Sequence, residues 1–136
     1  MVLAFARLAV SSTLLLTNLP ARAHWDDLGL SSDGDQLQVL RQTQAGVRGV
    51  YRSATLRLVL RPHALQDPRN GRWVADIASE WEFDCSVQTG VIRHSRIHYD
   101  DGSSKKSDAD TGVRALSPDS LVYAEMRALC EEIHGK

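Results

Sequence analysis

The chain has 136 residues, of which 43% are hydrophobic and 24% are charged, enough for one domain with a modest core. Its formal net charge is −1, from 16 lysines and arginines against 17 aspartates and glutamates. This balance argues against a nucleic-acid-binding protein and against strong general attraction to anionic membranes, and the ordinary charged fraction argues against wholesale disorder.

Residues 1–23 have the pattern of a secretory signal peptide. Arg7 supplies a positive N-terminal region, residues 8–16 form a short apolar run, and residues 21–23 (Ala-Arg-Ala) supply the small side chains that precede a cleavage site. The apolar run is too short for a stable membrane span. We therefore expect an exported protein, periplasmic or secreted to the cell surface, whose mature chain is one domain over residues 24–136. No cysteine lies near the cleavage site, so no lipid anchor is expected.

The first half of the mature chain has the pattern of strands separated by turns. Strands are predicted over residues 24–30, 36–43 and 50–61. Trp25 in the first of them is interpreted as an anchor into the core. Asp33-Gly34 is a strong hairpin signal because glycine accepts a positive φ. Residues 44–49 are predicted to form a loop, Pro62 to end the third strand, and the turn-rich residues 62–72 to form a long irregular connection.

The strongest strand signal covers residues 73–85, where side chains alternate with the period of a half-buried strand. The apolar face consists of Trp73, Ala75, Ile77, Ser79, Trp81, Phe83 and Cys85. The other face is largely acidic and consists of Val74, Asp76, Ala78, Glu80, Glu82 and Asp84. A turn at residues 88–90 predicts that residues 91–99 return as an antiparallel partner, with Arg93 or Arg96 opposite an acidic residue.

The face assignment of this partner strand follows from simple alternation. The side chains predicted to point inward are Val91, Ile97 and Tyr99, and those predicted to point outward are Ile92, His94, Arg96 and His98. The polar residues 100–112 that follow have room for one short edge strand around residues 103–107, where lysines discourage further pairing.

A C-terminal helix is predicted from about residue 118 to residue 133. Ser117 is expected to cap it, Pro118 to occupy its first turn, and Gly135 to end it. Its apolar stripe consists of Val122, Met126, Leu129, Cys130 and Ile133.

The two cysteines of the chain, Cys85 and Cys130, lie on the apolar face of a strand and on the apolar stripe of the helix. In an exported protein such a pair predicts a structural disulfide. A redox-active pair is the alternative, but reactive thiols usually lie close in sequence and near a helix N-terminus. The predicted fold is therefore α+β: an antiparallel β-sheet of about six strands, with a C-terminal α-helix packed on one face and tied there by the disulfide.

No catalytic, cofactor-binding or metal-binding constellation stands out in the sequence. His94 and His98 share a strand face but lie roughly 13 Å apart, too far to share one small ion. Glu80, Glu82 and Asp84 form an acidic row that is typical of the solvated face of a sheet. Trp73, at a strand end beside the long connection, is the better of the tryptophans as a binding residue.

Several short motifs together resemble the bacterial surface-adhesin protein E-like family. They are Trp25 after the signal peptide, Ser79-Glu80-Trp81-Glu82-Phe83-Asp84-Cys85, Arg93 and Tyr99, and Ser117-Pro118-Asp119-Ser120 before a helix that carries Cys130. The resemblance covers nearly all of the mature chain. It implies a six-stranded antiparallel sheet whose concave face holds the helix through the disulfide. It also implies adhesin-type binding of host matrix or plasma proteins, and haem binding is described for the namesake.

These observations lead to one functional expectation and two alternatives. We expect an exported, non-enzymatic binding protein that has no cofactor and no nucleic-acid partner. Its expected partner is a protein, such as a host matrix or plasma protein. Its candidate partner-binding residues are Trp73, His94, Arg96 and His98. The first alternative is a periplasmic enzyme inhibitor or envelope stress factor that acts through residues 63–72. The second is a haem-handling protein or a small hydrolase.

Overall fold

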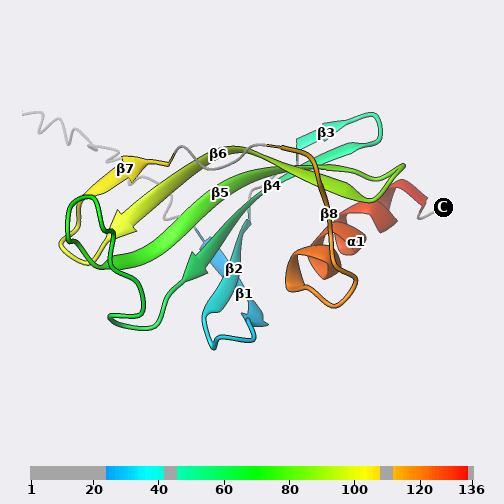
Figure 1. Cartoon of the computed structure of the whole chain (residues 1–136). Coiled ribbons are helices and arrows are strands. Elements are labelled where there is room, and N and C mark those ends of the chain that lie inside the picture. The colour runs from blue at the N-terminus through cyan, green and yellow to red at the C-terminus, as the bar shows by residue number, and fades with distance from the viewer. Residues whose placement is uncertain (1–23, 42–45, 108–111, 135–136) are drawn as a thin grey trace, which may run out of the picture.

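The computed structural model describes residues 24–41, 46–107 and 112–134. The predicted signal peptide lies outside these residues. The described strands are β1 (His24–Leu30), β2 (Gln36–Arg41), β3 (Gly46–Arg48), β4 (Tyr51–Val59), β5 (Val74–Asp84), β6 (Thr89–Tyr99), β7 (Ser104–Lys106) and β8 (Arg114–Ala115). One helix, α1 (Leu121–His134), follows them at the C-terminal end of the described chain (Figure 1).

All strand pairs are antiparallel, and the main path of the sheet runs β1-β2-β4-β5-β6-β7. The short strands β3 and β8 pair with β4 and β6. The predicted antiparallel sheet and C-terminal helix are thus confirmed, as is the edge strand near residues 103–107. The loop predicted over residues 44–49 is wrong in part, because Gly46–Arg48 forms β3.

Buried Arg52 holds the β3–β4 hairpin together by donating from Nη1 to the carbonyl oxygens of Gly49 (2.8 Å) and Tyr51 (2.9 Å).

The β5–β6 pair contains two β-bulges, and these decide which of its side chains share a face of the sheet. Residues paired across antiparallel strands lie on the same face. We call the face that carries Leu58, Ile77, Trp81 and Phe83 the inner face, and the face that carries Thr55, Arg57, Glu80, Glu82 and His94 the outer face; each set is in register across its strands.

The first bulge lies in β6, where Arg93 is an extra residue between the partners of Glu80 and Trp81. It makes Ile92 pair with Trp81 on the inner face, whereas Val91 pairs with Glu82 on the outer face. The predicted orientations of Ile92 and Val91 were therefore wrong. Strict alternation cannot represent an inserted residue, because a bulge reverses every assignment on one side of it.

The second bulge lies in β5, where Ala75 is the extra residue between Val74 and Asp76. Val74 pairs with Tyr99, and both side chains are buried, at 4% and 3% exposure. Val74 therefore does not belong with the acidic face to which alternation assigned it.

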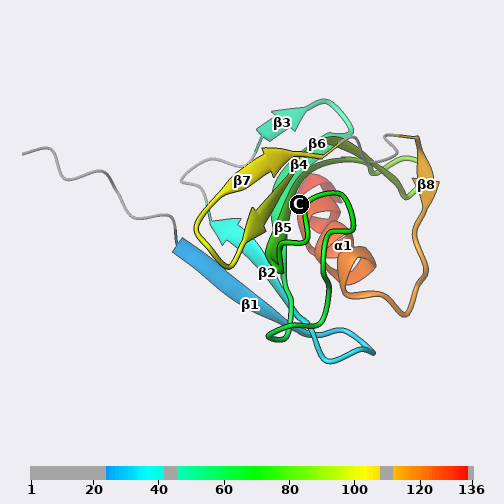
Figure 2. The same cartoon turned by 60° about the vertical axis from the view of Figure 1, so that its left-hand side comes forward.

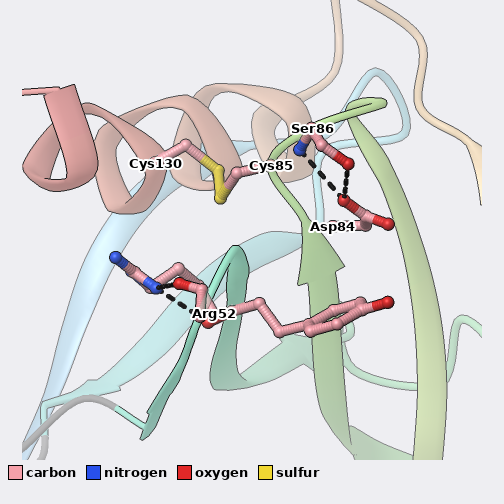
Figure 3. The surroundings of a disulfide bond; sticks show 7 residues. Arg52, Asp84, Cys85, Ser86 and Cys130 are labelled. Atoms are coloured by element: carbon pink, nitrogen blue, oxygen red, sulfur yellow. Dashed lines mark hydrogen bonds between the residues drawn. A yellow bond between two sulfur atoms is a disulfide. The ribbon is translucent and has the colours of Figure 1, made fainter.

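One hydrophobic cluster contains buried residues of both the sheet and α1. Its buried members are Leu37, Val39, Leu56, Phe83, Met126 and Cys130. Cys85, which directly follows β5, forms the predicted disulfide with Cys130 of α1, with an S–S distance of 2.05 Å (Figure 3). At the turn beside it, Asp84 Oδ1 accepts from the backbone nitrogen (2.9 Å) and the hydroxyl (2.5 Å) of Ser86.

The helix begins three residues later than predicted. Ser120 Oγ accepts a hydrogen bond from the backbone nitrogen of Tyr123 (3.1 Å), which makes Ser120 the N-cap residue. Ser117 was expected in this role, but its carbonyl oxygen accepts from Ser120 Oγ at 2.8 Å. Pro118 thus lies in the turn before the helix rather than in its first turn.

Trp25 lies on the outer face and is not the core anchor that we predicted. The guanidinium carbon of Arg57 lies 4.1 Å from the centre of a Trp25 ring, a cation–π contact. Arg57 also donates to Gln38 Oε1, and Gln38 donates to Asp27 Oδ1. These contacts tie β1, β2 and β4 together on the solvent side, a use of tryptophan that strand periodicity alone does not reveal.

Candidate functional site: an apolar groove on the inner face

The inner face is not filled by the hydrophobic cluster along its whole length. A cavity of about 640 Å³ opens beside the first turn of α1, and its floor is built by three neighbouring strands. The floor residues are Leu56 and Leu58 of β4, Ile77, Ser79 and Trp81 of β5, and Ile92 of β6. Leu58, Ile77 and Trp81 stay half-buried, although core positions of this kind would normally be closed.

A second cavity of about 430 Å³ continues along the same face toward the β4–β5 connection. Ile77 lines both cavities, and its cross-strand partner Ile97 lines the second one. We call the two cavities together the groove. In Figure 1, α1 lies at one end of the sheet and the β4–β5 connection lies at the other, both below the sheet. Figure 2 shows the same two segments on one side of the sheet from a second direction.

One hydroxyl group, that of Ser79, belongs to this apolar floor and is bonded to a second hydroxyl beside it. Ser79 and Ser95 are directly paired across β5 and β6, and their Oγ atoms are 2.9 Å apart. Ser95 Oγ also lies 3.4 Å from the carbonyl oxygen of Ala78, to which it can donate. Because the two hydroxyls bond to each other, they do not require a polar ligand group or a water molecule above them.

The wall formed by the β4–β5 connection is fixed by one buried carboxylate, Asp67. Its Oδ2 accepts from the hydroxyl of Tyr99 (2.6 Å) and from Lys105 Nζ (2.8 Å), and its Oδ1 accepts from the backbone nitrogen of Arg69 (2.9 Å). The Lys105 hydrogen bond, followed by those from Tyr99 and Arg69, holds the pKa of Asp67 well below its ordinary value. The same contact with Asp67 raises the pKa of Lys105.

We expect Asp67→Asn to lower stability at neutral pH and to change its acid dependence. The lowered pKa means that the ionised carboxylate stabilises the fold above its ordinary pKa of about 4, and that this contribution is lost as the pH falls toward the folded-state pKa. Melting temperatures measured from pH 7 downward should therefore differ most at neutral pH and converge in acid.

The matched control for this experiment is Asp33→Asn, since Asp33 is an exposed aspartate in the β1–β2 turn. Its melting curve should stay close to that of the wild type at every pH. A constant offset between wild type and Asp67→Asn down to the lowest pH would show that the charge of Asp67 does not hold the connection.

At the other end of the groove, the lining includes the N-cap Ser120 and the first helical residues Leu121 and Val122. Arg114 and Asp119 lie there as well, so this end carries one cationic and one anionic side chain. Of the described residues that line the larger cavity, only Arg114 and Asp119 carry a formal charge, and their two charges cancel.

The four residues predicted as partner-binding lie elsewhere. His94 and Arg96 are exposed on the outer face, opposite Glu80 and Ala78. His98 Nδ1 lies 2.6 Å from Asp76 Oδ1 on that face, so this ring is held by a neighbouring carboxylate. Trp73 is half-buried, with its ring centre 4.8 Å from that of His63. The structure brings three of the four to one face and leaves Trp73 beside the β4–β5 connection.

The predicted cross-strand charge pairing is confirmed for Arg93. Its Nη2 donates to Glu82 Oε1 at 2.7 Å, whereas Arg96 donates to the hydroxyl of Ser104 at 3.1 Å. Glu82, one carboxylate of the acidic row, is therefore paired with Arg93, the residue inserted at the bulge.

Sequence reasoning missed Asp67 and the groove itself. The signal for Asp67 was weak: one aspartate before a proline in a turn-rich stretch. Its partners Tyr99 and Lys105 are separated from it by more than thirty positions and become visible only through the register of β6 and β7.

Among the described residues, no three or more histidines, cysteines or acidic residues gather in a way that could hold a metal ion. Within the same residues, no helix is both long enough and apolar enough to cross a membrane. Searches of family models, of curated proteins and of solved structures found no match to this chain.

Proposed function

We propose that this chain is an exported, non-enzymatic binding protein whose ligand site is the groove on the inner face. The observation that carries the proposal is the half-buried apolar floor of Leu58, Ile77 and Trp81, which the cluster around Met126 leaves open. A largely apolar cavity of this size with a few convergent polar groups is the usual form of a small-molecule site.

The position of the helix is part of this proposal. We infer that α1 packs on the inner face at the end that carries Phe83 and leaves the end that carries Ile77 free. The shared cluster of Leu56, Phe83 and Met126 and the bond between Cys85 and Cys130 support this placement. The helix would then serve as one wall of the site and the β4–β5 connection as the other.

Export is supported by the disulfide and by the signal-peptide pattern of residues 1–23. A mature chain that begins at His24 is the form that we expect to carry the groove. Structural disulfides persist in oxidising compartments, which fits the periplasm or the cell exterior.

The groove is tested by placing a carboxylate on its floor. Ile77→Asp should weaken binding of the uncharged fluorescent probe N-phenylnaphthylamine by about tenfold or more, because a charged group in an apolar site must be desolvated when the probe enters. Binding is read as the rise in probe fluorescence on titration with protein, and folding of each variant is checked by circular dichroism.

Ala78→Asp is the matched control for this substitution. It adds the same charge at the next residue of β5, but on the outer face, where its register neighbours are Arg57 and Arg96. It should bind the probe like the wild type. Equal loss of binding in both variants, or no probe binding by the wild type, would refute the groove as the ligand site.

Adhesin-type binding is the second candidate function, and the exposed His94 and Arg96 on the outer face favour it. In this case binding to an immobilised host matrix or plasma protein should fall in His94→Ala/Arg96→Ala and persist in Ile77→Asp. The opposite pattern would assign protein binding to the inner face instead.

A further inference from the structure

The groove differs in charge between its two ends. The cavity beside the β4–β5 connection is lined by two cationic residues, Arg69 and Lys105, and by one carboxylate, that of Asp67. Lys106 also borders this cavity, but it pairs with Arg96, so its side chain belongs to the outer face. At the helix end, Arg114 and Asp119 balance each other. Among the lining residues, an excess of positive charge therefore lies at the connection end only.

The floor between these ends offers apolar side chains, because the backbone N–H and C=O groups of a strand lie in the plane of the sheet and not on its face. It is formed by β4 and β5, each paired on both sides, and by β6, which pairs with β5 along its length and with β8 and β7 near its two ends. An extended peptide laid on this floor would bury its own N–H and C=O groups without partners, which is costly. A hydrocarbon chain has no such groups, and the Ser79–Ser95 hydroxyls beneath it are already bonded to each other.

The dimensions fit a single chain of this kind. The two cavities, about 640 and 430 Å³, both lie in the range of small-molecule sites. The stretch of floor from Ile77 to Trp81 spans four residue steps of a strand, about 13 Å. The second cavity extends it past Ile77 toward Arg69 and Lys105.

We propose that the groove binds a long-chain fatty acid anion. The hydrocarbon chain lies on Leu58, Ile77 and Trp81 with its end toward α1, and the carboxylate lies at the connection end near Arg69 and Lys105. This inference rests on the proposed function and adds the ligand class and its direction in the site. Asp67 contributes by holding Lys105 and the connection in place, at 2.8 Å from Lys105 Nζ.

The test compares ligands that share a chain and differ in head group. Palmitate, hexadecanol and hexadecyltrimethylammonium, each below its micelle concentration, are used to displace N-phenylnaphthylamine from the wild-type protein. Palmitate should displace the probe at a concentration at least about tenfold lower than the cation, with the alcohol between them. Shortening the fatty acid should weaken displacement by up to about fourfold for each methylene removed, since each methylene leaves an apolar floor.

Charge reversal locates the head group. Arg69→Glu should abolish the preference for palmitate over the cation. The preference is taken as the ratio of the two displacing concentrations within one variant, so a change in affinity for the uncharged probe does not alter it. Arg127→Glu, on the exposed side of α1, is the control and should keep the wild-type preference. Loss of the preference in Arg114→Glu, with Arg69→Glu unaffected, would overturn the proposed direction.

The outcomes separate this inference from the proposed function. If the wild type binds the uncharged probe in an Ile77-dependent way but shows no preference for palmitate, the fatty-acid proposal fails and the groove remains a binding site. If the uncharged probe is not bound at all, both fail.

Discussion

Replacing both cysteines, Cys85→Ser/Cys130→Ser, should lower the free energy of unfolding by about 4 kcal/mol. The bond joins residues 45 positions apart, and the chain-entropy estimate for a loop of this length gives that value. Domains of this size are typically stable by only about 5–15 kcal/mol, so the loss is a large fraction of the total. Urea unfolding of oxidised wild type and of the double variant measures it.

Loss of the disulfide should destabilise α1 before it destabilises the sheet. Met126 remains fully buried in the cluster without the bond, so α1 keeps an apolar contact with the sheet. The hydrogen bonds between the strands do not depend on the disulfide. In hydrogen exchange, the amides of α1 should therefore lose protection before those of β5, and binding of the uncharged probe should weaken because Leu121 and Val122 line the groove.

The reductant dithiothreitol provides the control for the disulfide. It should lower the stability of the wild type toward that of the double variant and leave the double variant itself unchanged. The compartment is checked on the same sample, because exported protein should have the mass of a chain that begins at His24. Two free thiols in that protein, or equal stability of the two forms, would show that the bond does not organise the fold.

The pairing of β5 with β6 and the disulfide were accessible from the sequence because the elements that carry them have clear local patterns. Alternation over residues 73–85 and a turn at residues 88–90 define one hairpin, and β5 and β6 pair along it. The apolar period of the helix put Cys130 on its buried side, where the structure has it 9% exposed. These are short-range signals, which a single sequence carries well.

Features that depend on one inserted residue or on a distant partner were not accessible. The bulge at Arg93 moves Ile92 to the inner face, and no residue type near Arg93 indicates that a bulge is present. The apolar ring of Trp25 suggested a core position, but the register of β1 and β2 places it on the outer face, where Arg57 lies 4.1 Å from the ring centre. The short strands β3 and β8 pair with stretches of β4 and β6, and periodicity did not indicate either of them.

The groove was beyond sequence reasoning for the same reason. Its floor combines residues of β4, β5 and β6 that are neighbours only after the register is known, as Leu58, Ile77 and Ile97 show. Each of them looked like an ordinary core residue of an alternating strand. What distinguishes them is their partial exposure in the cavities beside α1 and the β4–β5 connection, a property of the tertiary structure.

Phe83→Ala should have an effect as large as the loss of the disulfide, about 3–5 kcal/mol. Phe83 is 0% exposed, and its ring centre lies 5.7 Å from that of Trp81 in a stacked arrangement. On β6, Gly90 is its partner, and a Cβ added there would lie 3.0–3.1 Å from ring atoms of Trp81 and Phe83. The site is so closely packed that removing the ring leaves a cavity that neighbours cannot fill.

Urea unfolding with Val87→Ala as control separates this effect from a general sensitivity of the hairpin. Val87 lies in the β5–β6 turn and is 64% exposed, so its loss should change stability by no more than about 0.5 kcal/mol. Trp81 also loses its stacking partner in Phe83→Ala, and its position on the groove floor should become less defined. Affinity for the uncharged probe should then fall together with stability. If Phe83→Ala unfolds at the same urea concentration as Val87→Ala, the contact between Phe83 and Trp81 does not support the floor, and the groove must be held open by the connection and the helix alone.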